Sequence, residues 1–144
     1  MNSGFSKFSW ENPCDFFVFD GNQKLFCGFE LKSTKGKAVS FQRDKDDKNQ
    51  RMIKYHQIKG LSKIAKYEGT IAGFIINFRD EQRDMERSYF LRIEDFNNFR
   101  HTTTKNSINE IEIIKHGAIK IEGKKLRKYY IWDIDKLLKE TTKI

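Results

Sequence analysis

Two apolar segments joined by a short polar turn restrict the fold of this chain more than any other feature, PCDFFVFDGNQKLFCGFELKS over residues 13–33. Residues 15–19 are apolar without alternation, which predicts a central strand covered on both faces. The tetrapeptide DGNQ at 20–23 is typical of a tight turn. Residues 24–32 are therefore expected to return as the second strand of a hairpin.

The end of the second predicted strand carries two opposite charges, Glu30 and Lys32. Side chains alternate across a strand, so these two project from one face while Phe29 and Leu31 project from the other. A charge beside so many apolar side chains has to be paired or bound to something. The pattern predicts a functional site, and the alternative is an ion pair on a half-exposed strand, worth about 0–1 kcal/mol.

Composition narrows the class of protein and its partners. A chain of 144 residues with 13 Phe is most simply one domain around one core. Its net charge of +8 favours a polyanionic partner, above all nucleic acid. Cys14 and Cys27 lie in the apolar strands and are interpreted as buried small side chains in a reducing compartment. With no signal-peptide pattern and no apolar run of ~20 residues, we expect a cytoplasmic protein that does not span a membrane.

The rest of the chain predicts alternating strands and helices. Residues 1–12 are interpreted as an N-terminal arm and residues 35–54 as a mobile basic loop, because the latter are dense in charge and lack apolar periodicity. Apolar residues at helical spacing predict a helix over 55–67. Further predicted elements are strands at 70–78 and 88–93, a short helix at 94–99, a helix over 107–116, extended pieces at 118–121 and 127–132 around a turn at 123–124, and a last helix after Asp133.

Two local motifs support the ends of the later helices. Ser107 and Glu110 have the spacing of a capping box, and Gly117 is expected to end that helix. Asp133 is expected to cap the last helix. The resulting order of elements predicts an α/β domain with a mixed central sheet flanked by helices.

An acid followed by Glu-x-Lys on the next strand resembles the PD-(D/E)XK nuclease superfamily, with Asp15, Glu30 and Lys32 in the motif positions. Later segments follow in an order that is similar to the RecU-type Holliday junction resolvases (penicillin-binding-protein-related factor A family). The resemblance covers roughly residues 13–138. The segments that carry it are FELKS at 29–33, HQI at 56–58, GFIINF at 73–78, SYFLRIEDF at 88–96 and SINEIEIIKHG at 107–117.

This resemblance implies a restriction-endonuclease-like core and a Mg²⁺-dependent, structure-selective DNA endonuclease that resolves four-way junctions as a homodimer. By position, Asp15 and Glu30 would bind Mg²⁺, with Mn²⁺ as a substitute, Lys32 would be the catalytic lysine, and Gln57 would face the site from a helix. Carboxylate oxygens suit Mg²⁺, and a lysine beside the metal can meet the charge that develops on the phosphate. Nearby cations would contact DNA phosphates without reading sequence: Lys35, Lys37, Arg43, Lys45, Arg51 and Lys54.

Several assignments stay open at this point. Asp20 competes with Asp15 for the metal role, although its turn position favours Asp15. Glu11 is the only acid upstream of Asp15, and the family's leading helix and projecting stalk are expected to be absent or much reduced. His56 is interpreted as structural or DNA-facing. Another PD-(D/E)XK nuclease (flap, nicking or restriction-like) and a non-catalytic DNA-binding module of the same fold are the alternative functions. Four aromatic side chains are expected in the core, those of Phe16, Phe17, Phe19 and Phe29.

Overall fold

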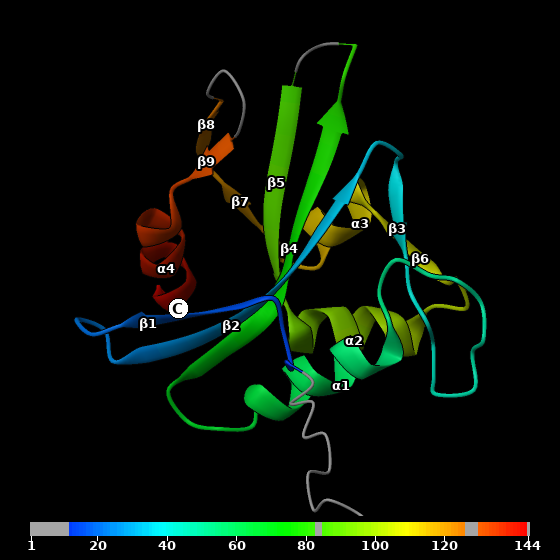
Figure 1. Cartoon of the computed structure of the whole chain (residues 1–144), viewed down its shortest axis with the longest axis horizontal. Helices are drawn as coiled ribbons and strands as arrows, with labels where there is room; N and C mark the ends of the chain where they lie inside the picture. The colour runs from blue at the N-terminus through cyan, green and yellow to red at the C-terminus, as the bar shows by residue number, and fades with distance from the viewer. Residues whose placement is uncertain (1–11, 83–84, 126–129, 144) are drawn as a thin grey trace, which may run out of the picture.

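The computed structural model of the chain describes residues 12–82, 85–125 and 130–143. Its centre is a mixed sheet of five strands in the order β1-β2-β4-β5-β7 (Figure 1). These strands are β1 (Phe16–Asp20), β2 (Leu25–Thr34), β4 (Thr70–Asp80), β5 (Met85–Arg92) and β7 (Ile119–Ile121). Two smaller ladders pair β3 (Ala38–Ser40) with β6 (Ser107–Asn109) and β8 (Gly123–Lys125) with β9 (Tyr130–Trp132).

The predicted hairpin of β1 and β2 is confirmed, with Phe16 opposite Phe29 and Asp20 opposite Leu25. Strand β2 then pairs in parallel with β4, and the crossover between them contains α1 (Tyr55–Ile64). The remaining pairings in the central sheet are antiparallel. The chain is therefore an α/β domain with a mixed sheet, as the order of elements predicted.

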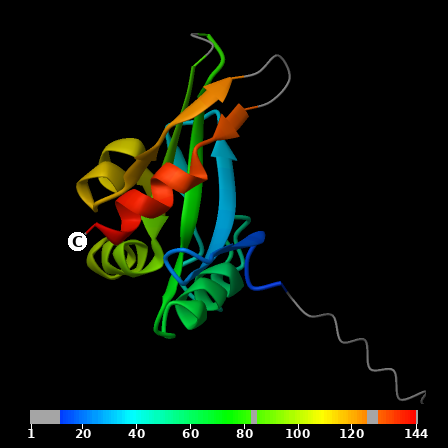
Figure 2. The ribbon, with the colours of Figure 1, turned by 90° about the vertical axis from the view of Figure 1, so that its left-hand side faces the viewer.

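Helices cover both faces of the sheet (Figure 2). On one face, α1 and α2 (Ile93–Thr102) enclose a core that includes Ile58, Phe74 and Phe96. On the other face, α4 (Ile134–Thr142) packs on a second core that includes Phe29 and Leu138. Side chains of β2 and β4 alternate between these two cores, so both strands lie in the middle of the domain.

Strand β1 is not the central strand that its composition predicted. It lies at the edge of the five-stranded sheet, where its side chains alternate between half-buried and exposed. Phe29 is fully buried, but Phe17 is 45% exposed and Phe19 is 70% exposed, so the prediction that these two belong to the core is wrong. An edge position leaves one side of the strand and part of one face without a covering element.

Residues 35–54 contain more regular structure than the predicted loop. Strand β3 pairs with β6, and Phe41 forms a bridge with Ile53. Val39, Phe41 and Ile53 are fully buried, so this segment contributes to the core beside α1 and α2. Isolated apolar residues within a charged stretch gave no periodic signal. The mobility of the segment stays a prediction.

Helix α3 (Glu110–Lys115) begins later than predicted, because Ser107 belongs to β6. The capping box is formed instead by Asn109 and Glu112, whose side chains each accept the other residue's backbone N–H at 2.8 Å. Asp133 caps α4 as predicted, accepting from the backbone N–H of Lys136 at 2.9 Å. The predicted turn at 123–124 is strand β8, and residues 1–11 of the predicted arm lie outside the described residues. Within the described part of the chain, no helix is long and apolar enough to cross a membrane.

Candidate functional site

Strand β2 and helix α1 bring together three of the predicted site residues. Glu30 and Lys32 project from the face of β2 that α1 covers, and Gln57 lies in the first turn of α1. One carboxylate oxygen, Oε1 of Glu30, accepts from Nζ of Lys32 at 3.0 Å and from Nε2 of Gln57 at 2.5 Å. The crossover from β2 to β4 therefore folds a distant amide onto the charged pair.

The Glu30 carboxylate is held in a buried position. The residue is 3% exposed, and its partner on β4 is Phe74. Burial raises the pKa of the Glu30 carboxyl above its ordinary value, whereas the hydrogen bond and charge of Lys32 oppose that rise. The negative charge of Asp15 raises this pKa further. A carboxylate that is costly to ionise and lies beside another acid is a common feature of functional sites.

Gln57 is fixed at both ends of its amide. Its Oε1 accepts the backbone N–H of Lys54 at 2.8 Å, while its Nε2 donates to Glu30. The first contact satisfies an unpaired N–H at the start of α1, which lacks a capping Ser, Thr, Asp or Asn. The Gln57 side chain is thereby oriented with its donor toward the carboxylate.

Asp15 lies at the open end of the hairpin, directly before β1. Its backbone N–H donates to Phe29 at 3.0 Å, and its Oδ2 accepts the backbone N–H of Leu31 at 2.7 Å. Gly60 of α1 permits this arrangement, because a Cβ at that position would come within 2.7 Å of the Pro13 carbonyl oxygen. The chain entering β1 thus packs closely on α1 and carries Asp15 next to Glu30.

The two carboxylates provide a donor set that fits a hard divalent cation. Asp15 is exposed, and among the described residues both hydrogen bonds to the Glu30 carboxylate go to Oε1, which leaves Oε2 for a ligand. The residues that the structure describes contain no cluster of three or more His, Cys, Asp or Glu that could hold a metal. Mg²⁺ commonly uses one or two carboxylates and takes its other ligands from water and substrate.

The other acids and the histidine considered from sequence take different positions. Asp20 lies in the β1–β2 turn, where its carboxylate accepts from the backbone N–H groups of Asn22 and Gln23. It therefore stabilises the turn, and it lies far from Glu30 along the hairpin.

Glu11 lies outside the described residues. His56 is exposed beside Gln57, and its charge favours the ionised form of Glu30.

Three of the six predicted DNA-contacting cations are exposed, and the other three are half-buried. Lys35, Lys37 and Lys45 are exposed, and Lys35 forms a 2.7 Å surface ion pair with Glu81. The Arg43 guanidinium donates four hydrogen bonds within the protein. Its Nε–H donates to the Asn106 side chain, and its Nη1 and Nη2 donate one and two hydrogen bonds to backbone carbonyls in and after α2. Two further side chains are half-buried and interact locally, Arg51 with Asp47 at 3.7 Å and Lys54 with Gln50 at 3.1 Å.

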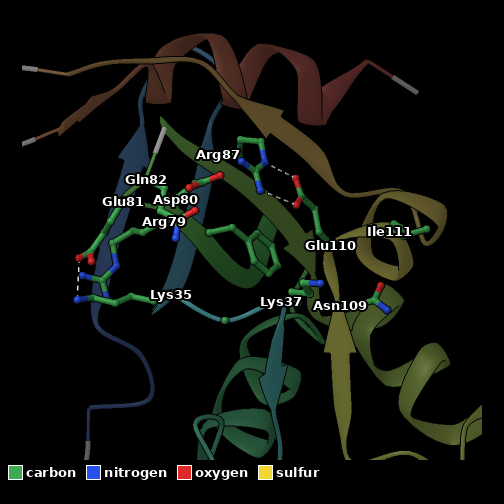
Figure 3. A pocket seen from close by; sticks show the side chains of 12 residues that line it. Lys35, Lys37, Arg79, Asp80, Glu81, Gln82, Arg87, Asn109, Glu110 and Ile111 are labelled. Atoms are coloured by element: carbon green, nitrogen blue, oxygen red, sulfur yellow. Dashed lines mark hydrogen bonds and ion pairs between the residues drawn. The ribbon is translucent and has the colours of Figure 1, made fainter. Parts of the chain in front are cut away.

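A cavity of about 730 Å³ lies at the end of the sheet, between the β4–β5 hairpin, the start of α3 and the segment after β2 (Figure 3). Lys37 lines it near Asn109, and Lys35 lies on one side of it beside Glu81 (Figure 3). On the other side, Arg87 binds Glu110 through two hydrogen bonds of 2.7 and 2.9 Å, which hold the pKa of Glu110 below its usual value. Tyr89 donates to the same carboxylate at 2.7 Å.

Sequence reasoning missed this network. Arg87 and Tyr89 are two residues apart on β5, and the register places Tyr89 in the same row as Lys32, with Ile76 between them. The cavity therefore lies next to the candidate site on the same face of the sheet. Alternation along residues 87–89 could have placed both side chains on one face, but their partner Glu110 is remote in sequence.

The fold and the site define an α/β domain whose mixed sheet presents two neighbouring carboxylates, a lysine and an oriented amide on one face. The chain is 31% identical over 144 residues to the SPbeta prophage-derived uncharacterized protein YotM of Bacillus subtilis (strain 168), covering 92% of this chain and 68% of that protein. The chain belongs to the same family as this prophage protein.

The chain is also similar to the Holliday junction resolvase RecU of Mycoplasmopsis pulmonis (strain UAB CTIP), with 36% identity over 100 residues. That alignment covers 69% of this chain and 52% of the resolvase, so the match spans about half of the resolvase's length. No protein-family model matches the chain.

Proposed function

We propose that this protein is a Mg²⁺-dependent, structure-selective DNA endonuclease of the PD-(D/E)XK superfamily that resolves four-way junctions. The observation that carries the proposal is the convergence of Lys32 and Gln57 on one oxygen of the buried Glu30 carboxylate, with Asp15 beside it. The similarity to a RecU resolvase over 100 residues supports the same activity independently of this geometry.

Each residue has a distinct task in the proposed reaction. Asp15 and Glu30 would hold Mg²⁺, or Mn²⁺ in its place, and the bound ion would activate water and offset charge on the phosphate. Lys32 would stabilise the developing negative charge near the scissile phosphate. Gln57 orients Glu30 through its donated hydrogen bond and so keeps Oε2 directed away from the amide.

The surroundings suit a DNA substrate. The chain carries a net charge of +8, and exposed Lys35, Lys37 and Lys45 follow the strand that bears the site. Phosphate contacts of this kind supply affinity without selecting a base sequence. Arg43 is less suited to such contacts, because four of its N–H groups bond within the protein.

Symmetric resolution of a four-way junction requires two cuts, and a two-fold homodimer would supply two sites. Sedimentation velocity of the protein with and without junction DNA tests this part of the proposal. A monomer in both conditions would contradict paired cutting by a dimer.

Substrate selectivity is tested with labelled four-way junction, flap and linear duplex in Mg²⁺ or EDTA, using wild type, Asp15→Asn and Lys32→Ala. We expect symmetric cuts in the junction alone, which both variants lose. Equal cutting of flap or duplex would instead identify another nuclease of the superfamily. Metal-independent binding with no cutting by the wild type would identify a non-catalytic DNA-binding module.

A further inference from the structure

Three phenylalanine side chains form an exposed aromatic patch on the edge hairpin. Phe17, Phe19 and Phe26 are 45%, 70% and 39% exposed. The rings of Phe17 and Phe26 stack with centroids 4.9 Å apart and planes inclined by 21°. Exposed rings grouped in this way are unusual on a highly charged surface and mark an interaction site.

The strand register places this patch in line with the candidate site. Asp15 lies beside Glu30, and the following rows on the same face are Phe17 opposite Gly28 and Phe19 opposite Phe26. Rows two residues apart are separated by about 7 Å, so the outer row lies about 14 Å from the carboxylates. A polymer bound at Glu30 and running along the hairpin would pass directly over the rings.

The contacts around Gly28 make the surface between the two places apolar. A Cβ on Gly28 would meet Cδ1 of Ile64 at 2.9 Å and Cε1 of Phe17 at 3.4 Å. These side chains therefore lie over the glycine and connect the patch to the last turn of α1. Together with Cys14, whose Sγ would lie 3.3 Å from that Cβ, these side chains form the surface between the carboxylates and the rings.

The segments next to the patch carry three exposed lysines and two acids, Asp20 and Glu68, so lysines predominate. Lys63 and Lys66 are exposed on and just after α1, and Lys24 is exposed in the hairpin turn. The backbone N–H of Phe26 donates to Gly69 at 3.0 Å, which places the segment after α1 beside the patch. Flat rings bordered by lysines match the bases and phosphates of a single strand.

We propose that Phe17, Phe19 and Phe26 form a stacking surface for unpaired nucleobases of the DNA strand that passes the Glu30 site. This inference rests on the proposed function and adds a reason for selectivity toward branched DNA, in which bases near the branch can leave the helical stack. Every base has a flat face, so the surface binds without reading sequence.

The test compares a duplex with the same duplex carrying a short thymine overhang that contains one 2-aminopurine, in EDTA. We expect wild type to prefer the overhang and to quench the 2-aminopurine emission. Phe19→Ala should weaken overhang binding about 5- to 150-fold, the range for loss of one stacked base, and leave duplex affinity unchanged. Phe19→Trp should retain the preference, whereas Phe19→Leu should lose it. Ile131→Ala, at another apolar position that is 53% exposed, is the matched control.

Several results would overturn the stacking surface. These are a wild type without overhang preference, a Phe19→Ala variant equal to wild type, or a Phe19→Leu variant that binds as wild type does. A dimer that Phe19→Ala converts to monomer with unchanged overhang preference would assign the patch to contacts between copies. Cleavage is scored separately: a protein that cuts no DNA but loses overhang binding in Phe19→Ala refutes the nuclease alone.

Discussion

The ion pair between Glu30 and Lys32 is expected to be nearly neutral for stability, although removal of the lysine alone should be costly. Their charged atoms lie 3.0 Å apart, with side chains 5% and 13% exposed. At an effective dielectric constant of 20, the attraction at this distance is about 5–6 kcal/mol. Taking each charge out of water costs several kcal/mol, which offsets most of that attraction.

Lys32→Met leaves the Glu30 carboxylate buried beside Asp15 without its cation. We expect the free energy of unfolding to fall by about 3–5 kcal/mol at about pH 8. Replacing both partners, as Glu30→Gln with Lys32→Met, should return stability to within about 1 kcal/mol of wild type or above it, because no unpaired charge remains.

The loss should depend on pH in a defined direction. Burial already raises the pKa of Glu30, and loss of Lys32 raises it further. A carboxyl whose pKa is raised in the folded state stabilises the fold at pH values below its unfolded-state pKa. That stabilisation is lost as the pH rises through its folded-state pKa. The deficit of Lys32→Met should therefore shrink as the pH falls from about 8 to about 5.

The assay is urea denaturation in EDTA at both pH values, with Lys35→Met as the control. Lys35 pairs with Glu81 on the surface, where both side chains are at least 60% exposed, so its loss should cost under about 1 kcal/mol. A Lys32→Met variant within about 1 kcal/mol of wild type at both pH values, or a deficit independent of pH, would refute the reasoning.

Three further outcomes test the surroundings of the site. Gly60→Ala should lower both the melting temperature and the cleavage rate, because the new Cβ displaces the backbone that enters β1, whereas Lys59→Ala on the same helix should change neither. Gln57→Leu should reduce cleavage about 10- to 100-fold with unchanged DNA affinity in anisotropy, as for loss of a group that orients a metal ligand; unchanged cleavage would contradict its orienting role. Glu110→Gln should cost about 1–3 kcal/mol near neutral pH in urea denaturation. Arg87 lowers the pKa of Glu110, so the stabilisation by Glu110 is present above its unfolded-state pKa and is lost as the pH falls through its folded-state pKa. A loss of stability in Glu110→Gln that does not depend on pH would contradict this role of the Arg87 pair.

Local chemistry was sufficient to predict the hairpin and the shared face of its charges. Turn residues at 20–23 and alternation around Glu30 and Lys32 are short-range signals, and the structure has both. The order of strands in the sheet is a long-range property. Nothing within residues 15–19 distinguishes an edge strand from a central one, so the exposure of Phe17 and Phe19 could not be read from them.

The candidate site was predictable to a similar extent. The position of Gln57 followed from the resemblance, whereas its attachment to Lys54 depends on where α1 begins. The contact between Arg87 and Glu110 joins β5 to α3 and requires the three-dimensional arrangement of both. Charged residues are abundant in this chain, so composition alone could not select the pairs that meet.

Metal-dependent cleavage by the wild-type protein tests the central claim most directly. The measurement is the initial rate of cutting of a labelled four-way junction as Mg²⁺ is titrated, for wild type, Asp15→Asn and Lys32→Ala that have been shown to be folded. We predict cutting by wild type that requires Mg²⁺ and is lost in both variants. Folded wild type that binds the junction and leaves it uncut at every Mg²⁺ concentration, or variants that cut as wild type does, would contradict the assignment of Asp15, Glu30 and Lys32 as a nuclease site.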